Sequence, residues 1–399
     1  MEMANFVEEN AVSRKNTHSL KWDALNERFG NPDLLPLWVA DMEFQTPKPV
    51  IEALKKRVEH GVFGYSKVPD DYFEKFNHWQ ETQHQITLQP EWLRFSKGVV
   101  ESLYHLLQIF TQEADSVLIQ PPVYYPFFNA IKDTKRKLVI NQLQKTATGY
   151  EIDLNDFEHQ IRTENVKLFL LCSPHNPVGR VWSEETLEQL LAICKKYQVL
   201  VIADEIHQDF VYAPNKFTSA LNVAKGAYQE QLIVVNAPSK TFNLASLLNA
   251  HVLIPNAILR ETYDQRIKVY SQSEHSDLGQ LAAKTAYEQG AEWFAGLKEV
   301  ILENYQYVKT TFAKELPTIE VAELQGTYLL WLNFESLALG ADLERFIKEE
   351  CQLAVDFGEW FSKETTQFIR LNLATTPKNI QKAVQQIIQA VKQREEEIR

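Results

Sequence analysis

Residues 232–243 read Leu-Ile-Val-Val-Asn-Ala-Pro-Ser-Lys-Thr-Phe-Asn, an apolar run that ends just before Lys240. Two upstream stretches follow the same design. The run 167–172 leads into Ser-Pro-His-Asn-Pro, and the run 199–203 leads into Asp-Glu-Ile-His. Short, continuous apolar runs are typical of strands buried on both faces of a sheet. The sequence therefore predicts three buried strands, each of which ends at a polar side chain.

These strands belong to a longer alternating series. Residues 183–197 repeat apolar side chains at helical spacing, and Ser183 is a suitable N-cap for that helix. Buried strands that alternate with helices predict an α/β fold with an open, mostly parallel sheet flanked by helices. Ligands bind such sheets at the carboxyl ends of the strands, where Asn176, Asp204 and Lys240 are expected to meet. Further strand-length apolar runs lie at 116–120, 137–141 and 250–254.

The 399 residues exceed what one hydrophobic core usually holds, so two domains are expected. From about Glu292 the pattern changes to a long helical stretch (293–316), followed by strand-like pieces at 327–334 and 368–373 and a final helical stretch. This α+β pattern predicts a smaller C-terminal domain. The predicted division is an N-terminal segment (1–48) associated with the small domain, a large domain (49–290) and a small domain (291–399).

The bulk composition excludes several classes of partner. A net charge of −12 and a pI near 5.4 disfavour nucleic acid and anionic membrane, since neither would be attracted. No apolar run approaches the ~18 residues of a membrane span. The three cysteines show no CxxC spacing and the ten histidines are scattered, so no metal site is expected. The sequence predicts a cytoplasmic protein in a reducing compartment.

Asp204 and Lys240 suit one cofactor in particular. A buried carboxylate is costly unless a positive charge accompanies it, and a protonated pyridine nitrogen would supply that charge at Asp204. A lysine amine at a neighbouring strand end can bind the aldehyde of the same ring covalently. The pair predicts pyridoxal 5'-phosphate as the cofactor. The alternatives are a surface lysine after a strand and an aspartate that caps a helix.

Two more side chains are placed to contact the cofactor ring. Asn176 lies between two prolines in a rigid turn, where its amide can bind the phenolic oxygen of the cofactor and a substrate carboxylate. Turn chemistry alone is the other explanation for this asparagine. His207 follows Asp204 by three residues and can donate to the same phenolic oxygen, or it can be a core histidine.

The cofactor phosphate needs hydrogen-bond donors. Gly98 precedes a helical stretch, so the amides of Val99 and Val100 can face an anion at a helix N-terminus. Ser239 adds a hydroxyl beside Lys240. Tyr124 can stack on the pyridine ring and contact the substrate, although it can equally be a packing residue.

Arg370 stands inside the apolar stretch Phe-Ile-Arg-Leu-Asn. An unpaired guanidinium is expensive there, whereas one that awaits a carboxylate is functional. Arg370 is therefore a candidate to bind the α-carboxylate of an amino-acid substrate, with an internal salt bridge as the alternative.

Together these residues resemble the pyridoxal-phosphate enzymes of the class I and II aminotransferase superfamily, which share the aspartate aminotransferase fold (fold type I). The closer resemblance is to the cystathionine β-lyase or C–S lyase branch, of the MalY/PatB type. Most members of the broader fold carry tyrosine where this chain has His207, which favours the branch. The motifs that carry the resemblance are residues 39–44 (Val-Ala-Asp-Met-Glu-Phe), 62–65 (Val-Phe-Gly-Tyr), 98–100 (Gly-Val-Val), 172–182, 204–207, 238–243, 326–331 and 370–372.

The resemblance implies a homodimer with shared active sites, in which Tyr65 reaches toward the cofactor phosphate of the other subunit. Some positions depart from the pattern. Ala237 and Leu248 stand where many members of the fold place a phosphate-binding hydroxyl and an arginine, and Ser246 replaces a usual glycine. These departures leave the grip on the phosphate and the preferred substrate open.

The function implied is α,β-elimination of cystathionine or another S-substituted L-cysteine to a thiol, pyruvate and ammonia. An aminotransferase would use the same residues up to the loss of the α-proton, so it is the main alternative. A regulatory or binding protein of the same fold is a third hypothesis, although partner binding would not require Lys240, Asp204 and Arg370 together.

Overall fold

The computed structural model describes residues 3–147, 149–270 and 275–398. Its largest element is a seven-stranded sheet in the order β2-β10-β9-β8-β7-β3-β4. The five strands from β9 to β4 are parallel, which confirms the predicted α/β class and the mostly parallel sheet. The strands are β2 (Leu93–Ser96), β3 (Ser116–Ile119), β4 (Lys137–Ile140), β7 (Val166–Cys172), β8 (Leu200–Asp204), β9 (Leu232–Asn236) and β10 (Ala250–Leu253).

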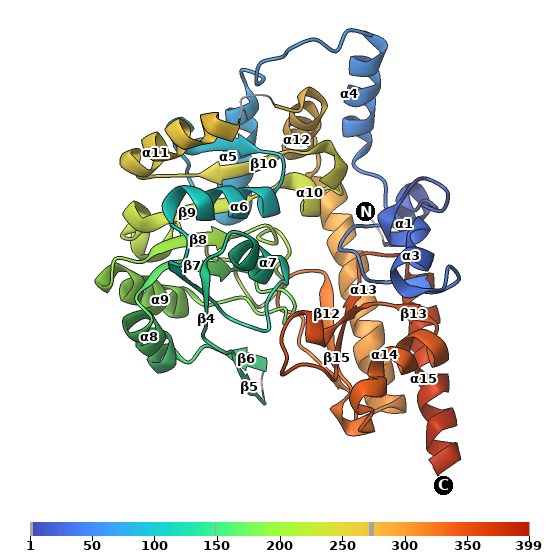
Figure 1. Cartoon of the computed structure of the whole chain (residues 1–399). Coiled ribbons are helices and arrows are strands. Elements are labelled where there is room, and N and C mark those ends of the chain that lie inside the picture. Colours follow the sequence, from blue (N-terminus) through green and yellow to red (C-terminus); the bar gives the residue numbers. More distant parts are fainter. Residues whose placement is uncertain (1–2, 148, 271–274, 399) are drawn as a thin grey trace.

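Helices cover both faces of this sheet (Figure 1). Along β8, Ile202 packs with α6, α7 and α11, whereas its neighbours Val201 and Ala203 belong to the core under α5, α8, α9 and α12. This alternation explains why the strands are apolar throughout, since each face meets a helical layer. The helices are α4 (Lys48–Glu59), α5 (Tyr72–His84), α6 (Val99–Phe110), α7 (Pro126–Asp133), α8 (Leu154–Thr163), α9 (Glu184–Lys196), α10 (Pro238–Thr241), α11 (Ala257–Ile267) and α12 (Asp277–Gln289).

The strand register brings the predicted polar positions to one edge. Cys172 at the end of β7 pairs with Asp204 at the end of β8, and Asp204 pairs in turn with Val235 near the end of β9. Asn176 follows β7 by four residues, and the four-residue helix α10 directly after β9 carries Lys240. Asn176, Asp204 and Lys240 therefore lie at the same edge of the sheet, where β7, β8 and β9 end.

One edge of the sheet differs from expectation. The strand predicted at 250–254 is present as β10, but it runs antiparallel to β9 and also to β2, which was not predicted. The connection 237–249 contains only α10 and a short 3-10 turn, so no long helix carries the chain back for a parallel strand. β2 is short, half-buried and paired only with β10, which leaves it without the apolar signature of its neighbours.

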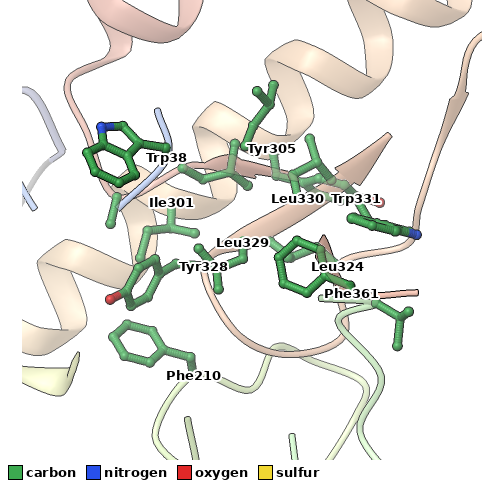
Figure 2. Close-up of a cluster of buried hydrophobic side chains, with 14 of the residues drawn as sticks. Trp38, Phe210, Ile301, Tyr305, Leu324, Tyr328, Leu329, Leu330, Trp331 and Phe361 are labelled. Atoms are coloured by element: carbon green, nitrogen blue, oxygen red, sulfur yellow. The ribbon is translucent and has the colours of Figure 1, made fainter. Parts of the chain in front are cut away.

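A second, antiparallel sheet has the order β11-β12-β15-β14 and packs against α13 (Figure 1). Figure 2 shows part of its core, in which Leu330 of β12 lies beside Tyr305 of α13, whereas Trp331 points to the other side, toward Leu324 and Phe361. Although α13 and α15 are long, none of the helices in the described ranges is apolar enough to cross a membrane. The elements are α13 (Ala291–Glu315), β11 (Glu320–Val321), β12 (Leu329–Asn333), α14 (Leu343–Arg345), β14 (Asp356–Phe357), β15 (Phe368–Asn372) and α15 (Pro377–Ile398).

The N-terminal segment joins the two sheets. After α1 (Met3–Asn10), α2 (Leu20–Asp23) and α3 (Leu25–Phe29), the short β1 (Leu35–Pro36) pairs in parallel with β13 (Leu353–Ala354). Residues 38–44, the crossing segment, then pass between the sheets. Asn372 donates to the carbonyls of Val39 and Asp41 in this segment, and Asn243 donates to those of Met42 and Phe44. The predicted domain boundaries themselves stay a prediction.

The contact between α12 and the 3-10 turn Ala245–Leu247 leaves no room for a side chain at Gly279. A Cβ atom added there would lie 2.2 Å from the carbonyl oxygen of Leu247. We expect Gly279→Ala to lower the free energy of unfolding by about 2–3 kcal/mol, because backbone must move to admit the methyl group. Urea unfolding measures this, with Gly64→Ala as the control, since a Cβ at Gly64 meets no atom within 4 Å. Equal stability of both variants would contradict the packing described here.

Candidate active site

A cavity of about 410 Å³ lies at the carboxyl ends of β7, β8 and β9. It is walled by residues of the large sheet, of the crossing segment and of the second sheet. Of the ten side chains singled out from the sequence, nine line this cavity, and only Tyr65 does not. The nine are Val99, Val100, Tyr124, Asn176, Asp204, His207, Ser239, Lys240 and Arg370.

Lys240 presents its amine to the cavity from α10. Its Nζ donates a hydrogen bond of 2.7 Å to the carbonyl of Ala40 in the crossing segment. Burial lowers the pKa of Lys240 to about 8, and the nearby Arg370 acts in the same direction, whereas Asp41 and Asp204 oppose the shift. A larger fraction of the amine is therefore neutral near pH 7.5 than for an ordinary lysine, and the neutral amine is the nucleophile.

Asp204 is 4% exposed at the end of β8. One carboxylate oxygen accepts from the amide of Ile206 at 3.1 Å. Burial raises the pKa of Asp204 to about 7, a shift that the Ile206 amide and the charge of Lys240 only partly oppose. Within the described ranges no lysine or arginine forms a salt bridge with this carboxylate, so the site has a buried acid that lacks a directly bound cation.

Arg370 lies in the centre of β15 and is 3% exposed. Its Nη1 donates to Oδ1 of Asn176 at 2.8 Å, which joins two of the predicted residues. Its Nη2 donates to the carbonyl of Trp38 at 3.2 Å and also to the carboxylate of Asp356. The internal salt bridge considered as the alternative is thus present, while Arg370 also faces the cavity.

His207 and Tyr124 complete the wall around the expected ring position. Burial, with help from the charges of Lys240 and Arg370, lowers the pKa of His207 well below its usual value, so its imidazole is neutral. Its Nδ1 is buried without a hydrogen-bond partner among the described residues, and its ring packs edge-on against Tyr328. Burial raises the pKa of Tyr124, which therefore stays a phenol at neutral pH.

The cavity is also lined by Val99 and Val100 at the start of α6 and by Ser239. No side chain caps the N-terminus of α6. Uncapped amides at the start of a twelve-residue helix favour an anion. The departures Ala237 and Leu248 line the same cavity, and Leu248 has a φ of +55°, whereas Ser246 is not part of the wall.

Tyr65 lies on the long connection between α4 and α5, which forms the loop at the top of Figure 1. Its side chain is 96% exposed and takes no part in the cavity of its own chain.

Sequence reasoning missed two parts of the wall. The first is the crossing segment, of which residues 39–44 counted only as a motif of the resemblance, although Trp38, Val39 and Ala40 line the cavity. The second is Asp356, a buried acid in the otherwise apolar stretch Leu-Ala-Val-Asp-Phe. The signal that singled out Arg370, a charge inside an apolar strand, is the same one that marks Asp356.

The donor set fits pyridoxal phosphate. Asp204 offers a buried negative charge for a protonated pyridine nitrogen, and Lys240 offers an amine with a lowered pKa for the aldehyde. The start of α6 and Ser239 offer donors for the phosphate in the same cavity.

Residues 32–387 match the family model described as aminotransferase class I and II. The chain belongs to this family. Cystathionine beta-lyase PatB of Bacillus subtilis is 33% identical to this family member, over 94% of the chain and 97% of PatB. Protein MalY of Escherichia coli is 32% identical, over 96% of the chain and 97% of MalY.

Solved structures agree with this family. Cystalysin from Treponema denticola, whose structure contains pyridoxal 5'-phosphate, aligns with a TM-score of 0.92. The two are 34% identical, and the alignment covers 96% of this family member and 98% of cystalysin. The resemblance inferred from the motifs is therefore confirmed over nearly the whole chain.

Proposed function

We propose that this protein is a pyridoxal-phosphate-dependent carbon–sulfur β-lyase, which cleaves cystathionine or other S-substituted L-cysteines to a thiol, pyruvate and ammonia. The observation that carries the proposal is that Lys240, Asp204 and Arg370, from three separate parts of the chain, line one cavity. The similarity to relatives named cystathionine beta-lyase favours a lyase over other reactions of the family.

The predicted residues of the cavity each have a proposed part in holding the cofactor. Asp204 would pair with the pyridine nitrogen, His207 and Asn176 would face the phenolic oxygen, and Tyr124 would stack on the ring. The donors for the phosphate are the amides of Val99 and Val100, together with Ser239. Once bound, pyridoxal phosphate supplies an electron sink for the negative charge that develops on the substrate Cα.

The protein residues supply positioning and proton transfer. Arg370 and Asn176 hold the carboxyl end of the amino acid, which orients the Cα–H bond toward Lys240. The neutral amine of Lys240, favoured by its lowered pKa, takes the α-proton. The Cβ–S bond then breaks with its electron pair on sulfur, and the ammonium of Lys240 can give its proton to the departing thiolate.

We also propose a cytoplasmic homodimer in which Tyr65 of each subunit contacts the cofactor phosphate of the other. Two observations support the dimer. Tyr65 is almost fully exposed, and it belongs to an exposed apolar stretch that includes Val62 and Phe63. An isolated monomer would leave this stretch in water, whereas a partner subunit would cover it.

The reaction with L-cystathionine in the absence of any keto acid tests the proposed function. The expected result is equal amounts of pyruvate and homocysteine, with many turnovers per enzyme. An aminotransferase would instead convert its cofactor to the amine form and stop until a keto acid is added, which an absorbance spectrum detects. A protein that binds the cofactor and gives neither result would be a regulatory or binding member of the family.

A further inference from the structure

The unpredicted strand pair at the edge of the large sheet brings two polar side chains together at the cavity. β2 and β10 pair in an antiparallel register that sets Ser96 opposite Ala250. Lys97 and Asn249 are the next residues outward on the two chains, so they lie across from each other. Both line the cavity, and both also line a small cavity that adjoins it. This corner of the cavity is therefore built by β2, β10 and the start of α6.

The anion site at the start of α6 lacks a strong cation of its own. Ala237 offers no hydroxyl there and Leu248 offers no guanidinium. The carboxylate of Glu101 lines the same cavity, where its negative charge opposes an anion. It accepts a hydrogen bond of 3.0 Å from the amide of Lys97. A phosphate at this position therefore needs donors beyond the helix amides and Ser239.

Asn249 offers a donor that is held in place. The side chain is 7% exposed and its Nδ2 donates to the phenolic oxygen of Tyr72 at 2.7 Å. This bond uses one N–H and fixes the orientation of the amide. The second N–H has no partner among the described residues, although the side chain lines the cavity. Asn249 is thus ready to donate to an anion in the cavity.

Tyr72 is itself held by a buried chain of hydrogen bonds. Its hydroxyl lies 2.6 Å from Nε2 of His251, and Nδ1 of His251 lies 2.8 Å from Oδ1 of Asn236. Because an amide oxygen only accepts, Nδ1 carries the proton and Nε2 accepts from Tyr72. Burial raises the pKa of Tyr72 and lowers that of His251 to about 3, so both stay neutral near pH 7. Tyr72 therefore gives its proton to His251 and accepts from Asn249.

Lys97 supplies the positive charge. The lysines and arginines that line the cavity in the described ranges are Lys97, Lys240 and Arg370. Lys240 and Arg370 already have parts in the proposed reaction, and Lys97 is exposed.

We propose that Asn249 and Lys97 bind the phosphate of pyridoxal phosphate, and that Tyr72 is a positioning residue for Asn249. Asn249 is the neutral donor, and Lys97 takes the place of the arginine that many members of the fold carry at position 248. This inference rests on the cofactor of the proposed function but not on the reaction that the cofactor serves.

The test compares pyridoxal phosphate with pyridoxal, which lacks the phosphate, as ligands of the full-length protein freed of cofactor. Absorbance titration gives a Kd for each ligand, and their ratio isolates the phosphate, because both ligands present the same ring. In Asn249→Ala, affinity for pyridoxal phosphate should fall by about 10–100-fold, the effect of losing a hydrogen bond to a charged group, while affinity for pyridoxal stays within about threefold. Tyr72→Phe should show the same selective loss at about fivefold, since the amide is then free to turn.

Lys97→Gln should weaken binding of pyridoxal phosphate by about fivefold at low salt and leave pyridoxal unaffected. Added salt should reduce this loss, and Lys97→Arg should restore the affinity. Lys216→Gln, the loss of an exposed lysine that does not line the cavity, is the matched control and should change neither Kd.

A wild-type ratio of the two Kd values in Asn249→Ala would show that Asn249 does not bind the phosphate, and the same result in Lys97→Gln would remove Lys97. If Asn249→Ala does not fold, Lys97→Gln decides the proposal, because an exposed side chain can be replaced without loss of the core. No substrate is needed for the ratio. A protein that shows the expected ratios but releases no thiol would refute only the lyase function, whereas thiol release with unchanged ratios would refute only this inference.

Discussion

Replacing Lys240 with alanine should reduce thiol release from L-cystathionine by about 10⁴-fold or more, because the variant loses both the covalent attachment of the cofactor and the base for the α-proton. Two side chains of the cavity are poor replacements for Lys240. Arg370 keeps its protons and is bound to Asn176 and Asp356, and burial lowers the pKa of His207 so far that it is a weak base. Rates of thiol release and absorbance spectra of the purified variant measure the effect.

Lys132→Ala is the matched control, since it removes an exposed lysine on α7 and should leave the rate unchanged. The Lys240→Ala protein should still bind pyridoxal phosphate, but dialysis should remove it. A variant that retained a rate within about tenfold of the wild type would refute the role of Lys240 and leave a binding function as the better account.

Asp204→Asn should favour the folded state of the cofactor-free protein as the pH rises, but it should weaken binding of the cofactor. Because burial raises the pKa of Asp204 to about 7, the native state holds this proton more tightly than the unfolded chain does. That contribution to stability is complete below about pH 4, the unfolded pKa, and is lost as the pH rises through 7. Without cofactor, the wild type should therefore lose about 3 kcal/mol between pH 5 and pH 8 that Asp204→Asn does not lose.

When the cofactor is bound, the wild type and not Asp204→Asn should be the more stable protein. Asparagine can accept a hydrogen bond from the pyridine nitrogen but cannot neutralise its positive charge, and removing one charge of a buried ion pair costs about 3–5 kcal/mol. Cofactor affinity and the rate of thiol release should together fall by about 10²–10⁴-fold. Urea unfolding of the cofactor-free forms at pH 5 and pH 8, and titration with pyridoxal phosphate, give the two quantities.

Glu205→Gln controls for the loss of a buried acid. The carboxylate of Glu205 accepts hydrogen bonds from the hydroxyl of Ser219 and the amide of Ala220, and it does not line the cavity. It should change stability without weakening cofactor binding. If Asp204→Asn bound the cofactor as tightly as the wild type, Asp204 would be only a structural acid.

The parts of the fold that follow from the sequence are those whose signal is local. β7, β8 and β9 are continuous apolar runs because helices cover both of their faces, and α9 begins after Ser183, whose hydroxyl accepts from the amide of Thr186. β2 was not predicted, because an edge strand that pairs with one neighbour does not need a continuous apolar run. The direction of β10 depended on the connection before it and not on its own residues.

The residues of the candidate site also divide into those that a local sequence signal predicts and those that it does not. Asn176, Asp204 and Lys240 could be predicted because parallel strands bring their carboxyl ends to one edge. Asp356 could not be linked to Arg370, because their contact depends on the register of two strands that the sequence leaves unspecified. Tyr65 and the predicted dimer stay predictions, because only two copies of the chain, seen together, can test them.

The crossing segment has a consequence for protein synthesis. Residues 38–44 leave the ribosome early, yet they are held by Asn243, Tyr328 and Asn372, which are made much later. A chain made only as far as α12 already contains Lys240, Asp204 and Asn243, but not the side chains that hold Val39 and Ala40. The wall of the cavity is therefore complete only when translation has passed Asn372.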